Sequence, residues 1–292
     1  MGVRPAKKMR NMVPTKPSPL VLLKPGSSGP AVFIVPGRND DAAVLLGFCD
    51  KIQFAGSIFG LQPRGLDCRE QPYDSIEEIA QDFASAMLNI QPVGSYNIIG
   101  VSLGGLVALE IAQQLIRTGK PISFLGLLDT YPDPRYWPLR CWLAVLASRA
   151  QHHATNVVKL SASDVLPYIA KISESLLDHF RSRLGKTPKM KWSKGTIEGS
   201  ETLRRLEESN ARALSRYQPH KYPGKITFVQ ARPVDVGGTK FPGNPATIWS
   251  GLCQAFELHV VQSDHRAMVR ADSDRVASVL AECLQREHIG MA

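Results

Sequence analysis

Cysteine is scarce and scattered in this chain of 292 residues. Disulfide frameworks and structural zinc sites use even or closely paired sets of cysteines, and no Cys-x-x-Cys pair occurs here. We therefore expect neither a disulfide framework nor a metal site, and the pattern favours the reducing environment of the cytoplasm. The five cysteines are Cys49, Cys68, Cys141, Cys253 and Cys283.

Long apolar runs are missing as well. A membrane-spanning helix needs about 20 consecutive, mostly apolar residues, and no stretch of this sequence approaches that length. The N-terminal segment also lacks an apolar core followed by a small-residue cleavage site, which argues against a secretory signal. We expect no membrane insertion.

Acidic residues are absent from the first 24 positions, which carry six basic residues. This segment supplies most of the net charge of +9, because the rest of the chain holds 29 basic against 26 acidic residues. Nothing in the chain interleaves aromatic and basic residues as nucleic-acid grooves do, so no nucleic-acid partner is expected. Residues 1–24, rich in proline and lysine, are predicted to form a flexible basic tail, whose role stays open.

Beyond this tail, short apolar runs alternate with segments of helical periodicity. The alternation is typical of an α/β protein in which helices cover both faces of a mostly parallel sheet. The helices expected on the sheet are 75–88, 106–117 and 272–287. The strands expected are 31–35, 56–60, 97–101, 123–128, 225–230 and 256–261.

Almost a hundred residues between the predicted strands 123–128 and 225–230 contain no convincing strand. Two amphipathic helices are predicted there, at 164–184 and 201–217, and the segment 135–147 is more apolar than a solvent-exposed linker needs to be. We expect residues 25–292 to form one domain, with a helical lid over the active site at about 133–218. Alternatively, these helices complete the core.

The sequence YNIIGVSLGGLVALEIAQQLI, residues 96–116, runs from an apolar strand through a Gly-x-Ser-x-Gly turn directly into a helix. This is the form of the nucleophile elbow in α/β-hydrolases. A serine hydroxyl is a weak nucleophile, and it needs a histidine to accept its proton and backbone N–H groups to bind the oxyanion. Ser102 is therefore predicted to be a covalent catalyst. The pentapeptide alone also occurs in ordinary glycine-rich turns, but the flanking strand and helix favour catalysis.

The base should be a histidine late in the chain, since the order in this fold is serine, acid, histidine. Among the seven histidines, only His265 falls in a loop after a late strand, where the carboxyl edge of the sheet would bring it beside Ser102. His265 is the predicted general base.

Two aspartates compete for the acid. Asp129 directly follows the strand next to the elbow strand, and Asp235 lies in a loop rich in proline and glycine after the strand that follows the insertion. Both positions can orient the same histidine in this type of fold. Asp129 is favoured, because the abrupt end of an apolar strand would hold its carboxylate half-buried and fixed. Asp264 is expected to be a loop carboxylate.

The oxyanion hole requires two backbone donors. One is the N–H of the residue after the nucleophile, Leu103, and the other comes from the loop after an early strand. That strand is 31–35, so the second donor is assigned to Gly37 or Arg38. Arg38 and Asn39 could instead cap the following helix.

With these residues in place, the chain resembles the thioesterase domains that end nonribosomal peptide and polyketide synthases. The spacing of 27 residues between Ser102 and Asp129 also resembles the multidomain members of that family. The resemblance covers about residues 30–284. It is carried by FGLQPRGLD with PYDSIEEIA (59–80), GVSLGGLVALEIA (100–112), LGLLDTYP (125–132) and SDHRAM (263–268).

The resemblance implies release, by hydrolysis or cyclisation, of an acyl, polyketide or peptidyl chain. Its thioester would be carried on the phosphopantetheine of an acyl or peptidyl carrier protein, or on coenzyme A, with no cofactor bound by the enzyme. Ser102 would hold the acyl chain as an ester, and His265 would move the proton. The chain starts with its own methionine and shows no carrier-protein motif, so it looks free-standing or excised from a synthase.

Two departures from the family pattern flank the expected site. Members usually carry a His-Pro-x-Gly-Gly-like stretch after the first strand, whereas this chain has Val-Pro-Gly-Arg-Asn at 35–39. The histidine segment usually continues with an aromatic residue, and Arg266 stands there instead. Two alternative functions stay open: a carboxylesterase or lipase acting on oxygen esters, and a non-catalytic α/β-hydrolase-like binding protein.

Overall fold

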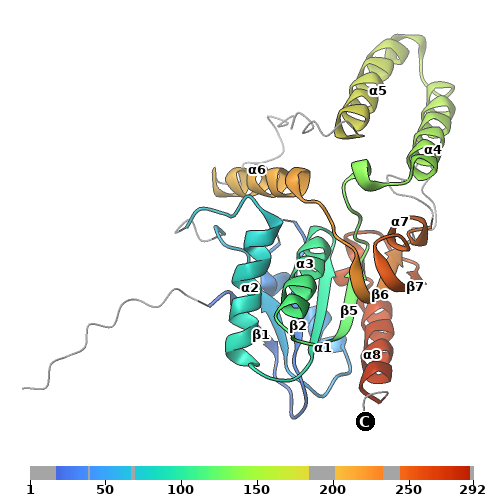
Figure 1. The fold of residues 1–292 in the computed structure, drawn as a ribbon. Helices are drawn as coiled ribbons and strands as arrows, with labels where there is room; N and C mark the ends of the chain where they lie inside the picture. Colours follow the sequence, from blue (N-terminus) through green and yellow to red (C-terminus); the bar gives the residue numbers. More distant parts are fainter. Residues whose placement is uncertain (1–17, 39, 67–69, 184–200, 233–243, 290–292) are drawn as a thin grey trace, which may run out of the picture.

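A seven-stranded sheet forms the centre of the molecule (Figure 1). The computed structural model describes residues 18–38, 40–66, 70–183, 201–232 and 244–289. The strand order is β1-β3-β2-β4-β5-β6-β7, and only β1 runs antiparallel to its neighbour. The strands are β1 (Leu20–Lys24), β2 (Val32–Val35), β3 (Ile58–Leu61), β4 (Tyr96–Val101), β5 (Ile122–Leu128), β6 (Tyr222–Ala231) and β7 (Cys253–Val261).

Helices cover both faces of this sheet, as predicted. Helices α2 (Ile76–Ile90) and α3 (Leu103–Arg117) pack on one face, and α1 (Leu46–Lys51) and α8 (Ser273–Ile289) pack on the other. Because successive side chains of a strand point to opposite faces, β4 contributes Ile98 to the first cluster and Ile99 to the second. Both faces of the central strands are therefore buried, which explains their continuous apolar sequences.

The predicted tail is wrong at its C-terminal end, because Leu20–Lys24 forms β1. This strand pairs with β3, with Val21 opposite Gly60, and the side chain of Leu23 is buried against the sheet. Val21 favours a strand, and pairing at the edge of an existing sheet, with the burial of Leu23, stabilises it. Residues 1–17 lie outside the described part of the chain.

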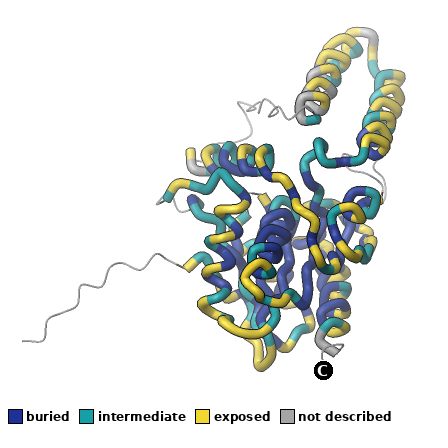
Figure 2. The backbone as a smooth tube through the Cα atoms, viewed as in Figure 1, coloured by how far each residue is buried: buried dark blue, intermediate teal, exposed yellow. Residues whose placement is uncertain are grey.

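The segment between β5 and β6 contains three long helices, α4 (Leu139–Val157), α5 (Ala162–Arg183) and α6 (Glu201–Arg216). Helices α4 and α5 form a hairpin that extends away from the sheet, whereas α6 lies across the ends of α2 and α3 (Figure 1). Most of the hairpin is exposed or half-buried (Figure 2). In contrast, Leu206 and Ala213 of α6 are buried. The insertion thus both completes the core, through α6, and projects from it.

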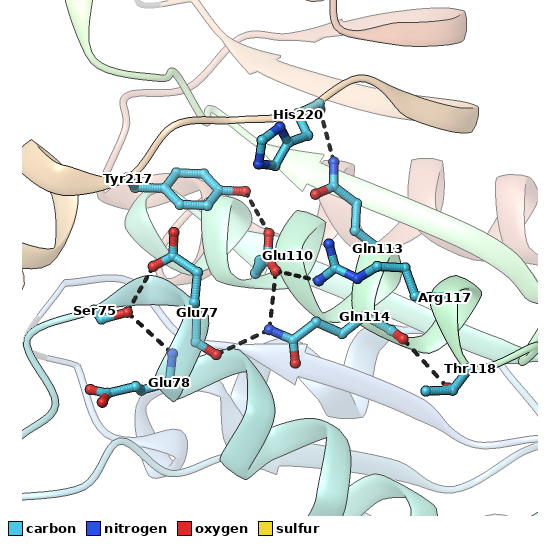
Figure 3. A network of polar contacts seen from close by, with 10 residues as sticks. All are labelled: Ser75, Glu77, Glu78, Glu110, Gln113, Gln114, Arg117, Thr118, Tyr217 and His220. Atoms are coloured by element: carbon cyan, nitrogen blue, oxygen red, sulfur yellow. Dashed lines mark hydrogen bonds and ion pairs between the residues drawn. The ribbon is translucent and has the colours of Figure 1, made fainter.

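A buried carboxylate joins α3 to the end of α6 (Figure 3). Glu110 of α3 accepts hydrogen bonds from Arg117 at 2.9 Å, from Gln114 at 3.0 Å and from the hydroxyl of Tyr217 at 3.3 Å. One turn further, Gln113 donates to the carbonyl of His220 at 2.8 Å. These contacts fix the elbow helix against the chain segment that leads from α6 into β6.

Candidate active site

The candidate site lies at the carboxyl edge of the sheet, where the chain connectivity reverses. Strand β2 has β3 on one side and β4 on the other, so the loops that leave β2 and β4 diverge and open a crevice between them. Ligands of open α/β sheets bind at such a switch point. Ser102 follows β4, and Gly37 follows β2 at this edge.

Ser102 stands on a sharp turn between β4 and α3. Its φ of +54° and ψ of −118° are rare for a residue with a side chain. Its N–H donates to the carbonyl of Leu128 at 2.9 Å, which ties the turn to β5. A Cβ on Gly100 would lie 2.4 Å from the carbonyl oxygen of Gly104, and a Cβ on Gly104 would lie 2.1 Å from that of Pro36. Both glycines are therefore required for the tight approach of the elbow.

The structure brings Ser102, His265 and Asp129 together. The Nε2 of His265 lies 3.0 Å from the Oγ of Ser102, and its Nδ1 lies 2.7 Å from Oδ2 of Asp129. The Asp129 side chain is only 6% exposed, while that of His265 is 39% exposed toward the crevice. Asp129 also has a positive φ, +46°, and its N–H donates to the carbonyl of Val229 in β6 at 2.9 Å.

The loop that carries His265 is held by short polar contacts. Asp264 accepts the backbone N–H groups of Arg266 and Ala267, each at 2.8 Å, as expected for a loop carboxylate. Ser263 donates to Asp272 at 2.9 Å. These bonds close the loop on itself and limit the freedom of the histidine.

An ion pair links this loop to the loop after β2. Arg270 contacts Asp40 at 2.9 Å. Sequence reasoning missed this pair, because the two residues are 230 positions apart and neither lies in a recognisable motif. The contact connects the two loops that border Ser102.

A cavity of about 970 Å³ opens above these residues. Its size is within the range of pockets that hold drug-sized ligands. Tyr131 and Trp137, which sequence reasoning did not assign to the site, form part of its wall, and α4 and α6 contribute Arg149, Glu207 and Leu214. Burial raises the pKa of Tyr131, and Asp129 raises it further.

The predicted oxyanion donors border the same cavity. Leu103 is the first residue of α3, and the first N–H groups of a helix have no acceptor within the helix. A Cβ built on Gly37 would lie 4.0 Å from the Cβ of Ser102, so the loop after β2 is close to the nucleophile. Gly37 and Arg38 both line the cavity.

The competing acid and the other histidines differ in position. Asp235 lies outside the described residues, whereas Asp129 is the carboxylate on His265. His259 lies within β7 and contacts Glu257. His152 and His153 belong to α4, and neither borders the cavity.

Glu257, His259 and Cys283 form a group of potential metal ligands on β7 and α8, with ligand atoms within 4.8 Å of one another. Arg286 already contacts Glu257 at 2.5 Å and the sulfur of Cys283 at 3.1 Å, and Lys225 contacts Glu257 at 3.3 Å. Two cations at this position oppose a divalent ion by Coulomb repulsion. None of the three ligands lines the cavity, and we assign them no metal.

A family model and several known proteins match this sequence. A family model described as "Thioesterase domain" matches residues 48–284, which is most of the chain. The "Dimodular nonribosomal peptide synthase" of Bacillus subtilis (strain 168) is 32% identical over 114 residues, and "Vanchrobactin synthetase VabF" of Vibrio anguillarum is 35% identical over 105 residues. These matches cover 39% and 36% of this chain but only 5% and 4% of the two synthetases.

Solved structures show the same architecture. The Vlm2 thioesterase domain bound with a dodecadepsipeptide matches with a TM-score of 0.58 and 19% identity, over 91% of this chain and 98% of that one. The RedJ thioesterase of the prodiginine pathway in Streptomyces coelicolor matches with a TM-score of 0.56 and 19% identity. The match covers 87% of this chain and 89% of that one. At this identity the likeness concerns the fold, and it confirms the predicted α/β-hydrolase fold.

Within the described ranges, no helix combines the length and the apolar character needed to cross a bilayer.

Proposed function

This chain belongs to the thioesterase domain family, and from that membership we propose that it releases an acyl, polyketide or peptidyl chain from a thioester through an ester on Ser102. The arrangement that carries the proposal is the chain of contacts from Ser102 through His265 to Asp129, at 3.0 and 2.7 Å, on the floor of the cavity. It supplies a nucleophile, a base and a group that orients the base.

In the first half of the proposed reaction, Ser102 Oγ attacks the thioester carbonyl as His265 Nε2 accepts the serine proton. The tetrahedral oxyanion is bound by the N–H of Leu103 and by that of Gly37 or Arg38. The carbon–sulfur bond then breaks, and the proton on His265 passes to the departing sulfur. Asp129 remains ionised and stabilises the imidazolium.

In the second half, water or a nucleophile of the acyl chain itself attacks the serine ester. His265 accepts the proton of the attacking group, the bond to Ser102 Oγ breaks, and the serine recovers its proton from His265. The outcome is a free acid or a ring, depending on the attacker. All groups that move protons belong to side chains, so the proposed enzyme needs no bound cofactor.

We propose phosphopantetheine on an acyl or peptidyl carrier protein, or coenzyme A, as the source of the thioester. Support comes from the relatives, which include a dimodular nonribosomal peptide synthase and the vanchrobactin synthetase VabF. We place the activity in the cytoplasm, since the four cysteines among the described residues are free thiols and buried.

Paired assays of wild type and Ser102→Ala test this proposal. Thiol release is followed with hexanoyl and decanoyl thioesters of N-acetylcysteamine and coenzyme A, and hydrolysis with the matching ethyl esters. We expect thioester turnover that falls by about 10³-fold or more in Ser102→Ala. Ser278→Ala on α8 is the control, because its exposed hydroxyl donates to the helix carbonyl of Asp274 and lies outside the cavity wall, and it should match wild type.

Two results would contradict the proposal. Turnover that persists in Ser102→Ala would remove Ser102 from the mechanism. A higher kcat/KM for the oxygen esters would make the protein an esterase.

A further inference from the structure

Two arginines flank the Ser102–His265 pair at the positions where this chain departs from its family. Arg38 directly follows Gly37, and Arg266 directly follows His265. Both side chains line the cavity, and both are exposed to it. Each is therefore one residue away from a group proposed to act on the scissile carbonyl.

Other charged groups around the cavity already have partners. Arg270 contacts Asp40 at 2.9 Å, Asp129 contacts His265 at 2.7 Å, and Asp133 contacts Arg135 at 3.1 Å. Asp40 and Asp133 are thus each paired with an arginine, whereas the carboxylate of Asp129 is held by the imidazole of the base.

Arg38 and Arg266 differ from this pattern. Throughout the described ranges, no carboxylate lies within 4.0 Å of either guanidinium. Glu207 on α6 is an acidic group that acts electrostatically on Arg38. A guanidinium on the cavity wall with no carboxylate in contact can bind an anion there through charge-assisted hydrogen bonds.

The reach of the two side chains limits where that anion can be. Arg38 and Arg266 are adjacent in sequence to Gly37 and His265, so an anion that they bind would lie near the scissile carbonyl. The phosphate of a pantetheine arm is at the far end of that arm from the sulfur. An anionic group on the acyl chain, a few bonds from the carbonyl, is therefore the better match.

On the basis of the proposed thioesterase function, we propose that Arg38 and Arg266 bind an acidic substituent, a carboxylate, on the acyl group. Arginine suits this role because its planar fork of N–H groups matches a carboxylate in a bidentate geometry. The substrate class is then a carboxyacyl thioester, and the two substitutions relative to the family act as specificity determinants.

The test compares kcat/KM for pairs of N-acetylcysteamine thioesters equal in chain length, butyryl with succinyl and hexanoyl with adipoyl. In wild type we expect at least one carboxyacyl thioester to be preferred over its neutral partner by about tenfold or more, the size of a charge-assisted hydrogen bond. Arg266→Gln should remove most of this preference, mainly through KM, and Arg266→Lys should retain part of it. Arg275→Gln, on the exposed side of α8, should keep the full preference.

A further pair, hexanoyl-pantetheine and hexanoyl-phosphopantetheine, separates the acyl carboxylate from the phosphate. A preference for the phosphorylated arm that disappears in Arg266→Gln would overturn the assignment to the acyl group. Ser102-dependent turnover of neutral thioesters with no preference for carboxyacyl ones would also overturn it, while leaving the thioesterase function intact. Absence of any Ser102-dependent turnover would instead overturn the proposed function itself.

Discussion

Ser102 and Asp129 are the two residues other than glycine that have a positive φ in the described part of the chain, at +54° and +46°. Such backbone conformations cost of order 1–3 kcal/mol each and persist where the surrounding structure enforces them. Here the N–H of Ser102 is held by β5 and that of Asp129 by β6. Strands β4 and β5 thus each end in a turn, and these turns direct the side chains of Ser102 and Asp129 toward His265. The strain is therefore located where the proposed chemistry needs fixed geometry.

Replacement of the acid tests this arrangement at a single residue. Asp129→Asn should slow acyl-enzyme formation by about 10³- to 10⁴-fold, because an amide cannot hold His265 in the required tautomer or stabilise its charged form. Asparagine tolerates a positive φ, so the fold should persist. The measurement is single-turnover acylation by rapid quench, with thermal unfolding as the control for folding.

The matched comparison for this variant is Asp235→Asn, at the competing position. It should acylate at the wild-type rate. If Asp235→Asn lost activity while Asp129→Asn kept it, the acid would have to be reassigned.

Among individual residues, the sequence predicted those that belong to short motifs. Ser102, Asp129 and His265 follow apolar strands that share one edge of a parallel sheet, so strand order alone suggests that they meet. The pair Asp40 and Arg270 carries no such signal, because its residues lie in irregular loops whose paths depend on tertiary packing.

Among the elements, helix α3 is fixed both at its start and in its middle. Its first turn carries the elbow, and its middle is fixed by Glu110, whose side chain is 3% exposed. Burial raises the pKa of Tyr217, and the negative charge and hydrogen bond of Glu110 raise it further, so the tyrosine stays protonated and donates to the carboxylate. The network therefore joins the nucleophile helix to the insertion.

Removal of this carboxylate should destabilise the protein. Glu110→Ala leaves the buried hydroxyl of Tyr217 without its acceptor, and we expect a loss of about 1–3 kcal/mol in the free energy of unfolding. Tyr217→Phe removes only one hydrogen bond and should cost about 0.5–1.5 kcal/mol. Urea denaturation measures both.

The control is Glu282→Ala on the exposed side of α8, which should stay within about 0.5 kcal/mol of wild type. A Glu110→Ala protein as stable as this control would show that the network contributes nothing to the anchoring of α3.

Most helices and strands were predictable from periodicity and start signals. Ser75 caps α2 by accepting the N–H of Glu78, as its capping-box sequence indicates. Strand β1 was missed, because a run of four apolar residues beside a basic, proline-rich stretch gives no local sign that a sheet edge will pair with it.

In the whole molecule, the parallel sheet sets the positions of Ser102, Asp129 and His265, and the insertion forms part of the cavity wall. Helix α6 is held to the body by Arg216, which contacts Asp74 at 2.9 Å, and by Ser209, which donates to the carbonyl of Tyr73 at 2.6 Å. Helices α4 and α5 contact each other through Trp142 and Phe180, with ring centroids 5.0 Å apart, and project beyond the sheet (Figure 1). The sequence predicted α5 and α6 as helices, whereas it marked the start of α4 only as an apolar segment, and the placement of all three depends on contacts between segments far apart in the chain.

Ser102, activated by His265 and Asp129, is the proposed nucleophile of this thioesterase-family protein. Covalent labelling with an alkyl fluorophosphonate, read by intact mass and peptide mapping, tests this role. We predict one adduct per chain, located on Ser102, absent in Ser102→Ala and formed far more slowly in Asp129→Asn. An adduct on another residue, or equal labelling of Ser102→Ala, would exclude Ser102 as the nucleophile.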